Sequence, residues 1–415
     1  MADIPFPERL LSGPPLDAGL ESFLDQSSRL GPVPGPGDVE RLITTLEASE
    51  LLGRGGAGFP VGRKWRAIAE RQGPPAVVVV NGAEGEPASG KDRALMAARP
   101  HLIIDGAILA AEAIGADEIL FYVGREHEVA VAAMASAIDE RSTSQRRPMR
   151  LVQAPLGYVA GEASAAVNYL NTGNARPTTS PPRVSERGVK GRPTLVQNVE
   201  SLAYAALIAR FGDGWYRSMG RSESPGTALI TVTGAGRHEG VREIELGTTV
   251  GEIATAVGAS ASDVQAVVVG GYFGTWAPAA DAWDMPLDPA VMKAHGLAFG
   301  CGIVGLLQND VCGVSATAEI MAFMAAESAG QCGPCVHGLR AIGSTTRRVA
   351  EGSGRAGDLR DLERWTTQIP GRGACRHPDG AIQLMTSALN TFGEEFAHHA
   401  RTGRCAITGS RIEAA

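Results

Sequence analysis

Residues 53–60, GRGGAGFP, form the first pattern in the chain that is suited to ligand chemistry. Glycines let backbone N–H groups approach an anion closely, and a helix that starts just after such a loop adds its positive end. Arg54 within the loop, or Lys64 eleven residues after the first glycine, is expected to supply a charge-assisted contact to the anion. The pattern predicts an anion site, with an ordinary tight turn as the alternative; its residues are Gly53, Arg54, Gly55, Gly56, Ala57, Gly58 and Lys64.

A second polar loop, residues 81–93 (NGAEGEPASGKDR), directly follows the apolar run 76–80 (AVVVV). That run is typical of a buried parallel strand, and ligands of α/β sheets bind beyond the carboxyl ends of strands. Asn81, Glu84 and Glu86 can therefore bind the polar edge of a flat heterocycle or a chain of hydroxyls. A solvated acidic turn that caps a helix is the alternative.

The cysteines form a third pattern. Cys332 and Cys335 have C-x-x-C spacing, and Cys375 follows forty residues later. Thiolates in this arrangement suit an iron–sulfur cluster; a zinc site completed by a histidine, or small buried side chains without a metal, are the alternatives. Three further cysteines occur singly and are expected to be ordinary core or surface residues: Cys301, Cys312 and Cys405.

The elements predicted around these patterns fall into three groups. Strands at 76–80, 118–123 and 149–153 alternate with helices at 64–71, 100–116 and 126–141, which favours a three-layer α/β domain. A hairpin (228–233 and 241–246), a helix (249–257) and a strand (266–269) resemble a β-grasp module. Helices at 316–328, 335–351, 359–367 and 381–398 predict a C-terminal four-helix bundle.

The expected organisation is a multidomain α/β protein. It comprises an N-terminal arm (1–38) with a short helix near 20–29, the α/β domain (39–222), the β-grasp module (223–300), the helical domain (301–400) and a tail (401–415). Helices are also predicted at 38–52, 161–170 and 196–212.

Bulk properties exclude several classes of protein. The 415-residue chain has a net charge of −7, which argues against a nucleic-acid partner. Six cysteines are too few for a disulfide scaffold. No apolar stretch reaches the roughly 18–20 residues that span a bilayer, and the first residues lack the features of a signal peptide. A cytoplasmic location is expected.

Four ordered segments resemble a known family: GRGGAGFPVGRKW, VVNGAEGEPASGKDR, GEASAAVNYL and GRPTLVQNVESL. In order and spacing they are similar to the flavoprotein subunit of respiratory complex I and to the diaphorase subunits of NAD-linked hydrogenases and formate dehydrogenases. The resemblance extends over roughly residues 38–400 and implies the cofactor FMN.

The resemblance also implies roles for individual residues. The glycine loop and Lys64 would hold the phosphate side of FMN, and the loop that begins at Asn81 would contact the ring and the ribityl group. The remaining flavin-side positions are Glu84, Gly161, Glu162, Thr194, Gln197 and Asn198. Two positions depart from the family pattern: Ala83 replaces an acid, and Gln197 replaces an asparagine.

The nicotinamide side departs further. Phe59 and Glu86 are kept, but Ala67 replaces an aromatic residue, Ala163 replaces a carboxylate, and the family's K-P-P-F is Ser-Pro-Pro-Arg at 180–183. An aromatic contact contributes about 0.5–1.5 kcal/mol beyond burial. Loss of two such contacts and a lysine predicts NAD(H) binding weakened by a factor of about 10² to 10⁴.

The cysteine region departs at one position. In the family, four cysteines bind a cubane cluster; here Cys332, Cys335 and Cys375 remain, and Ala329 stands at the first position. The expected group is a 4Fe-4S cluster with a non-cysteine or solvent ligand, with His337 and His377 as candidates, or a 3Fe-4S cluster. Loss of the cluster is the alternative.

Together these features predict an FMN-dependent oxidoreductase that passes electrons between a reduced donor and an iron–sulfur or ferredoxin-like partner. No side chain is expected to act as a catalyst, because the chemistry belongs to the flavin. The expected partners are other electron-transfer subunits or a ferredoxin-like protein, and the chain, without a transmembrane segment of its own, would dock to a membrane complex. The alternatives are an NAD(P)H:acceptor oxidoreductase with a rearranged nicotinamide pocket and a cofactor-poor assembly or interaction protein.

Overall fold

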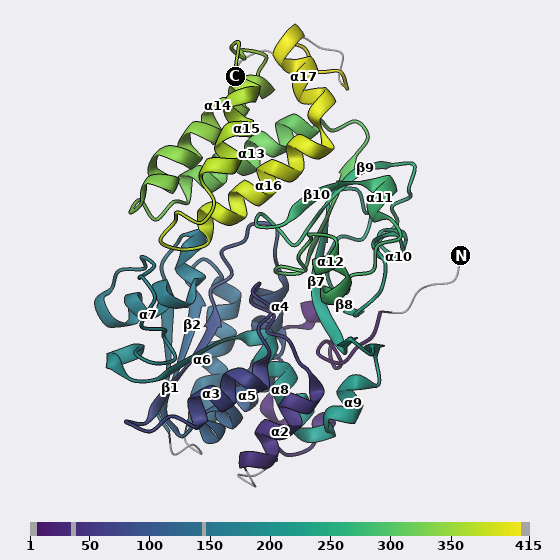
Figure 1. Ribbon diagram of the computed structural model, residues 1–415. Helices are drawn as coiled ribbons and strands as arrows, with labels where there is room; N and C mark the ends of the chain where they lie inside the picture. Colours follow the sequence, from purple (N-terminus) through teal and green to yellow (C-terminus); the bar gives the residue numbers. More distant parts are fainter. Residues whose placement is uncertain (1–5, 35–38, 143–146, 408–415) are drawn as a thin grey trace.

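The computed structural model describes residues 6–34, 39–142 and 147–407. Parts of the predicted arm (1–5 and 35–38) and of the predicted tail (408–415) lie outside the described residues. Figure 1 shows an elongated molecule, with a helical group at one end, a first sheet at the other and a second sheet beside them.

The first sheet is parallel throughout, with strand order β3-β2-β1-β4. Its valine run is fully buried because both faces are covered: residues 78 and 80 belong to the core formed with α5 and α8, and residues 77 and 79 to the core formed with α7. The strands are β1 (Ala76–Gly82), β2 (Ala116–Gly124), β3 (Met149–Ala154) and β4 (Thr194–Asn198).

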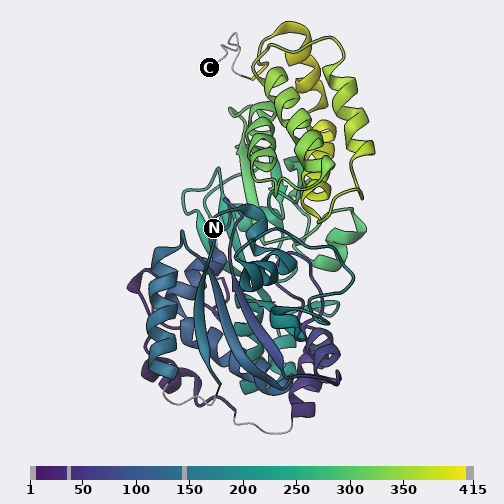
Figure 2. The same cartoon turned by 90° about the vertical axis from the view of Figure 1, so that its left-hand side faces the viewer.

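Helices surround this sheet on both faces (Figure 2). They are α2 (Val39–Ser49), α3 (Val61–Ala69), α4 (Lys91–Ala98), α5 (Pro100–Ala113), α6 (Glu128–Ser142), α7 (Ala163–Thr172), α8 (Val199–Phe211) and α9 (Asp213–Arg217); α1 (Phe23–Leu30) lies in the N-terminal segment. Within the described residues, no single helix is long and apolar enough to cross a bilayer; α4 and α5 pass that test only as a pair bent by 96°.

The helix predicted at 196–212 is wrong in its first turn. Residues 196–198 complete strand β4, and α8 begins only at Val199. Asn198 sets this boundary, because its side chain accepts hydrogen bonds from the amides of Glu200 and Ser201 at the start of α8. Strand and helix therefore meet at a residue of the predicted flavin side.

The second sheet has five strands in the order β10-β9-β11-β7-β8. The strand β11 lies in its centre, parallel to β7 and antiparallel to β9. The predicted boundary at residue 300 would separate this central strand from its sheet. The elements here are β7 (Thr227–Thr233), β8 (Gly240–Glu245), α10 (Val250–Ala256), β9 (Val264–Val269), β10 (Thr275–Pro278), α11 (Ala279–Ala282), α12 (Pro289–Ala294) and β11 (Ile303–Gln308), after the short pair β5 (Gly220–Arg221) and β6 (Ser224–Pro225).

The C-terminal helices share one apolar core. The predicted helix at 381–398 is two helices, because the chain breaks at Phe392, whose ring packs on Trp276. The helices are α13 (Gly313–Ala326), a π-helical turn (Pro334–Leu339), α14 (Arg340–Ala350), α15 (Asp358–Gln368), α16 (His377–Thr391) and α17 (Gly393–Thr402).

Candidate functional site

Two of the predicted motifs leave the first sheet at the same edge. Asn81 at the end of β1 is paired in register with Asn198 at the end of β4. Because these strands are parallel, the loop after Asn81 and the turn into α8 lie next to each other, at the edge where α/β sheets bind ligands.

The glycine loop lies against this edge. The Gly53 amide donates to the Phe59 carbonyl at 2.9 Å and closes the loop. A Cβ atom on Gly55 would lie 3.3 Å from Cβ of Asn198, so the loop backbone rests on the turn into α8. Gly56 and Gly58 have φ of 97° and 61°, and residues 55–59 are exposed. The loop therefore presents its backbone to solvent in a conformation that favours glycine.

The turn at residues 161–162 meets the loop of Asn81 directly. The Asn81 side-chain amide donates to the Gly161 carbonyl at 2.8 Å. A Cβ atom on Gly161 would lie 2.5 Å from the Ala83 carbonyl oxygen, so only glycine allows this approach. Glu162 caps α7 by accepting hydrogen bonds from the first amides of the helix. Three separate motifs thus converge at one sheet edge.

A cavity of about 670 Å³ adjoins these motifs, between the α/β part and the C-terminal helices. Thr194 contributes from β4, Lys64 from α3 and Glu162 from the start of α7. Burial lowers the pKa of the Lys64 ammonium to about 8, and this group donates to the Val196 carbonyl. The cavity volume is within the range of about 300–1,000 Å³ that is usual for cofactor sites.

The positions that depart from the nicotinamide-binding pattern line this same cavity. They are Ala67 of α3, Ala163 of α7, and Ser180 and Arg183 of the loop before β4, and they lie beside the retained Pro182 and the retained Phe59, which is 55% exposed. These substitutions therefore act together on one surface.

Glu86, the other retained nicotinamide-side residue, does not line this cavity. Its carboxylate accepts hydrogen bonds from the Tyr272 amide at 2.8 Å and from the Tyr158 hydroxyl at 3.0 Å. Burial raises the pKa of Glu86 to about 7. The structure therefore places this group in the packing between the first sheet's loop and the second sheet.

Two predicted flavin-side residues have their side chains engaged in packing. Glu84 accepts from the amides of Asp92 and Arg93, both at 3.1 Å, and so caps α4. The Arg54 guanidinium is 3% exposed and donates to the Tyr216 hydroxyl and to the Thr227 carbonyl. It points into the molecule and is not placed to supply the charge contact to an anion that the sequence suggested.

A buried charge cluster that the sequence did not predict lies beneath the loops. Lys91 contacts Asp92 at 2.6 Å and Glu200 at 2.8 Å, and Glu200 lies 3.7 Å from Arg54. The Asn198 side-chain amide donates to the Asp92 carboxylate at 2.6 Å. Burial raises the pKa of Asp92 to about 7. The cluster therefore joins the glycine loop, the second polar loop and the start of α8.

The three predicted cluster cysteines lie at the end of the helical group that faces the cavity. Cys375 lines the cavity, and its sulfur accepts from the His377 amide. Burial, together with Cys332 and Cys375 nearby, raises the pKa of the Cys335 thiol to about 12. Of the two histidine candidates, His337 is exposed and His377 is buried, with its Nε2 2.8 Å from the Met324 carbonyl.

The residues present fit both cofactors. For a flavin, the exposed glycine backbone, the adjoining cavity and a buried Gln197 Oε1 atom without a hydrogen-bond partner offer a cradle and free polar groups. For an iron–sulfur cluster, three thiols lie at one end of the helices, next to the same cavity. Thiolates are the ligands that such clusters require.

Comparisons with known proteins agree with this interpretation. Residues 46–206 match the Nuo51 FMN-binding domain, and residues 315–399 match the NADH-ubiquinone oxidoreductase-F iron-sulfur binding region. The two matches define the class: an electron-transfer flavoprotein with an FMN-binding domain and an iron–sulfur region.

Relatives of known name identify the family. The chain is 31% identical to the F 2 subunit of NADH-quinone oxidoreductase from Rhizobium meliloti, over 88% of this chain and 90% of that protein. It is 32% identical to the F subunit of NADH-quinone oxidoreductase from Streptomyces coelicolor, over 88% and 83%. The chain belongs to the family of NADH-quinone oxidoreductase F subunits and is an oxidoreductase of that type.

The fold is also similar to that of a solved structure. A chain of the NAD⁺-reducing [NiFe]-hydrogenase in its H2-reduced state superposes with a TM-score of 0.83 at 30% identity. The match covers 90% of this chain and 65% of the hydrogenase chain. A mixed α/β fold built around a parallel sheet is therefore confirmed.

Proposed function

We propose that this chain binds FMN at the sheet edge, takes electrons from a reduced donor there, and passes them through the cysteine region to an iron–sulfur or ferredoxin-like partner. One observation carries the proposal: a single cavity is lined by flavin-side residues (Lys64, Thr194 and Glu162) and by Cys375. Donor, flavin and cluster would then meet at one cavity.

Bound FMN would supply two-electron uptake and one-electron release. The exposed backbone of residues 55–58 would hold the phosphate, and Lys64 of α3 would contribute a positive charge from the cavity wall. Asn81, Gly161 and Asn198 would fix the position of the ring. They hold the loop after Asn81, the turn at residues 161–162 and the turn into α8 in contact with one another. Gln197 would offer its free amide oxygen as an acceptor. Arg54 would anchor the glycine loop through its buried guanidinium contacts and would not contact the phosphate.

The region around Cys332, Cys335 and Cys375 would hold an iron–sulfur cluster, which supplies one-electron transfer. Ala329 leaves one ligand position without a thiol. His377 is the favoured histidine candidate, because it is buried, its Nδ1 has no hydrogen-bond partner and its Nε2 lies 2.8 Å from the Met324 carbonyl oxygen.

Within this proposal the chain divides into an FMN domain, a β-grasp module that includes β11, and a C-terminal iron–sulfur helical domain. The partners are other electron-transfer subunits, as in the complexes to which its relatives belong, and the location is the cytoplasm. Supporting this division, β11 is hydrogen-bonded within the five-stranded sheet. The C-terminal helices share a core that is distinct from that of the first sheet and includes one face of the second sheet, through Ala266, Val268, Trp276 and Leu307.

Anaerobic purification with flavin and iron quantification tests the proposal. We expect FMN and iron in the same preparation and reduction of the flavin by dithionite. A colourless preparation with neither cofactor would refute it and would support an assembly or interaction protein.

NAD(P)H is a second candidate donor, since Phe59 remains on the cavity wall. Because the cavity lacks the family's second aromatic residue and second carboxylate, we expect weak flavin bleaching by NADH, with an apparent affinity lower by about 10² to 10⁴ than that of family members with the full pattern. The double variant Ala67→Phe/Ala163→Glu should strengthen bleaching. Full bleaching of the wild-type flavin at micromolar NADH would show that the cavity binds NADH tightly despite these substitutions.

A further inference from the structure

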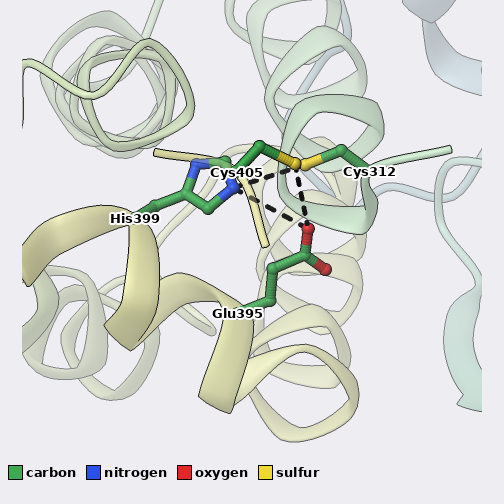
Figure 3. Close-up of side chains that lie close together, drawn as sticks. All are labelled: Cys312, Glu395, His399 and Cys405. Carbon is green, nitrogen blue, oxygen red and sulfur yellow. Dashed lines mark hydrogen bonds and ion pairs between the residues drawn. The ribbon is translucent and has the colours of Figure 1, made fainter. Parts of the chain in front are cut away.

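Four donor side chains converge in the helical group, away from the predicted cluster cysteines. They are Cys312 at the start of α13, Glu395 and His399 on α17, and Cys405 after α17 (Figure 3). Their ligand atoms all lie within 4.8 Å of one another. Cys312, His399 and Cys405 are buried, with exposed fractions of 7%, 1% and 5%.

We propose that Cys312, Glu395, His399 and Cys405 bind one structural zinc ion. Two thiolates, one imidazole and one carboxylate form a donor set that zinc accepts in tetrahedral sites. The four residues come from the start of α13, from α17 and from the segment after α17. The first of these is distant in sequence from the other two, so a bound metal would cross-link separate parts of the chain.

The distances fit a tetrahedron of that size. Zinc bonds of about 2.3 Å to sulfur and about 2.0–2.2 Å to nitrogen or oxygen give ligand-to-ligand distances of about 3.3–3.8 Å. Sγ of Cys312 lies 3.6 Å from Nε2 of His399, and Oε1 of Glu395 lies 3.7 Å from the same nitrogen. Sγ of Cys405 lies 3.9 Å from Oε1 of Glu395. Little movement is needed to admit an ion at the centre.

The surroundings orient the ligands as in established metal sites. Nδ1 of His399 lies 3.3 Å from the Val349 carbonyl oxygen, which directs Nε2 toward the other donors. The Ser315 amide donates to the Cys312 sulfur at 3.3 Å, and the positive end of α13 favours a thiolate there. Buried together, two thiolates and a carboxylate carry three negative charges, and a divalent cation offsets two of them.

The backbone brings the segments together. Phe392 ends α16 and lets α17 turn toward the start of α13, where a Cβ on Gly313 would lie 2.5 Å from the Phe392 ring. Gly403 ends α17 with φ of 63°. It packs closely against Gly352, because a Cβ atom on Gly352 would lie 2.7 Å from the Gly403 carbonyl oxygen. This turn returns Cys405 to the other ligands.

The site is distinct from the iron–sulfur region. Cys312 precedes the first turn of α13, whereas Cys332 follows its last residue, Ala326. A helix of 14 residues is about 20 Å long. The two groups therefore lie toward opposite ends of one helix.

Metal analysis of the full chain, purified without oxygen or chelator, tests the proposal. We expect about one zinc per chain in addition to any iron. Cys312→Ser and His399→Gln should lose the zinc and keep the flavin, whereas Cys375→Ser should lower iron and keep zinc. Cys301→Ser is the matched control, because this half-buried cysteine lies outside both groups, and it should change neither metal.

Cobalt provides a test that does not depend on the variants folding. Co²⁺ added to the metal-depleted wild type should give the visible bands of a tetrahedral ion and thiolate charge transfer. Zn²⁺ should protect Cys312 and Cys405 from alkylation until a chelator is added. Absence of bound zinc after incubation with Zn²⁺, full zinc retention in Cys312→Ser, an octahedral cobalt spectrum or a Cys312–Cys405 disulfide would each overturn the proposal.

Discussion

Replacement of Glu200 should weaken both of the loops predicted to hold the flavin. This carboxylate has no exposed surface; it accepts from the Leu229 amide at 2.9 Å, lies 2.8 Å from the Lys91 ammonium and lies 3.7 Å from Arg54. Glu200→Ala leaves the cations Lys91 and Arg54 buried without this carboxylate. Lys91 still has an ion-pair partner, because the Asp92 carboxylate lies 2.6 Å from its ammonium. Removing one partner of a buried ion pair costs about 3–5 kcal/mol. Because Asp92 remains, we expect a loss of about 3 kcal/mol in the free energy of unfolding.

The assay is urea unfolding followed by tryptophan fluorescence, to which the fully buried Trp65 of α3 contributes, together with FMN retained after desalting. Glu200→Gln keeps the acceptor for Leu229 and removes the charge, so it should cost less, about 1.5–3 kcal/mol. Glu70→Ala is the surface control, since its side chain is 68% exposed and its ion pair should contribute under about 0.5 kcal/mol. The reasoning is refuted if Glu200→Ala unfolds like the wild type and retains its flavin.

Three further changes test other parts of the structure. Gly161→Ala should lower FMN content, because its Cβ would meet a carbonyl oxygen at 2.5 Å, while Gly214→Ala, with no atom within 4 Å, should not; equal flavin in both would contradict the predicted contact. Cys375→Ser should reduce iron in the anaerobic protein without loss of flavin, and unchanged iron would place the cluster elsewhere. Burial raises the pKa of Glu86 from 4.5 to about 7, so the folded state binds more protons and stability should fall as pH rises from about 4.5 through about 7, by at most about 3 kcal/mol. Glu86→Gln should therefore raise the melting temperature at pH 8 more than at pH 5, and an equal shift at both would show that this carboxyl is not the titrating group.

Much of the α/β part could be predicted because its signals are local. The valine run before Asn81 indicated a buried parallel strand, and the structure confirms it as β1. The turn into α8 could not be located in the same way, because Val196 and Gln197 fit a helix as well as a strand. Only the pairing of β4 with β1 decides between them.

The site was predicted as motifs, but side-chain directions were not. Nothing in the glycine loop shows that Arg54 turns inward, because its partners Tyr216 and Thr227 are more than 160 residues away. The grouping of Cys312 with Cys405 was missed for the same reason. Glu395 and His399, four residues apart on one helix, were the available signal for it.

The inward direction of Arg54 also affects the thermodynamics of cofactor uptake. The glycine loop is tethered from below by the guanidinium contacts of Arg54 and by the hydrogen bond from its amide to the Ser201 hydroxyl at 2.9 Å. A loop that is already ordered loses little conformational entropy when a phosphate arrives, so more of the contact energy remains as affinity. Arg54, which was expected to bind the anion directly, would thus favour anion binding by holding the glycine loop in its binding conformation.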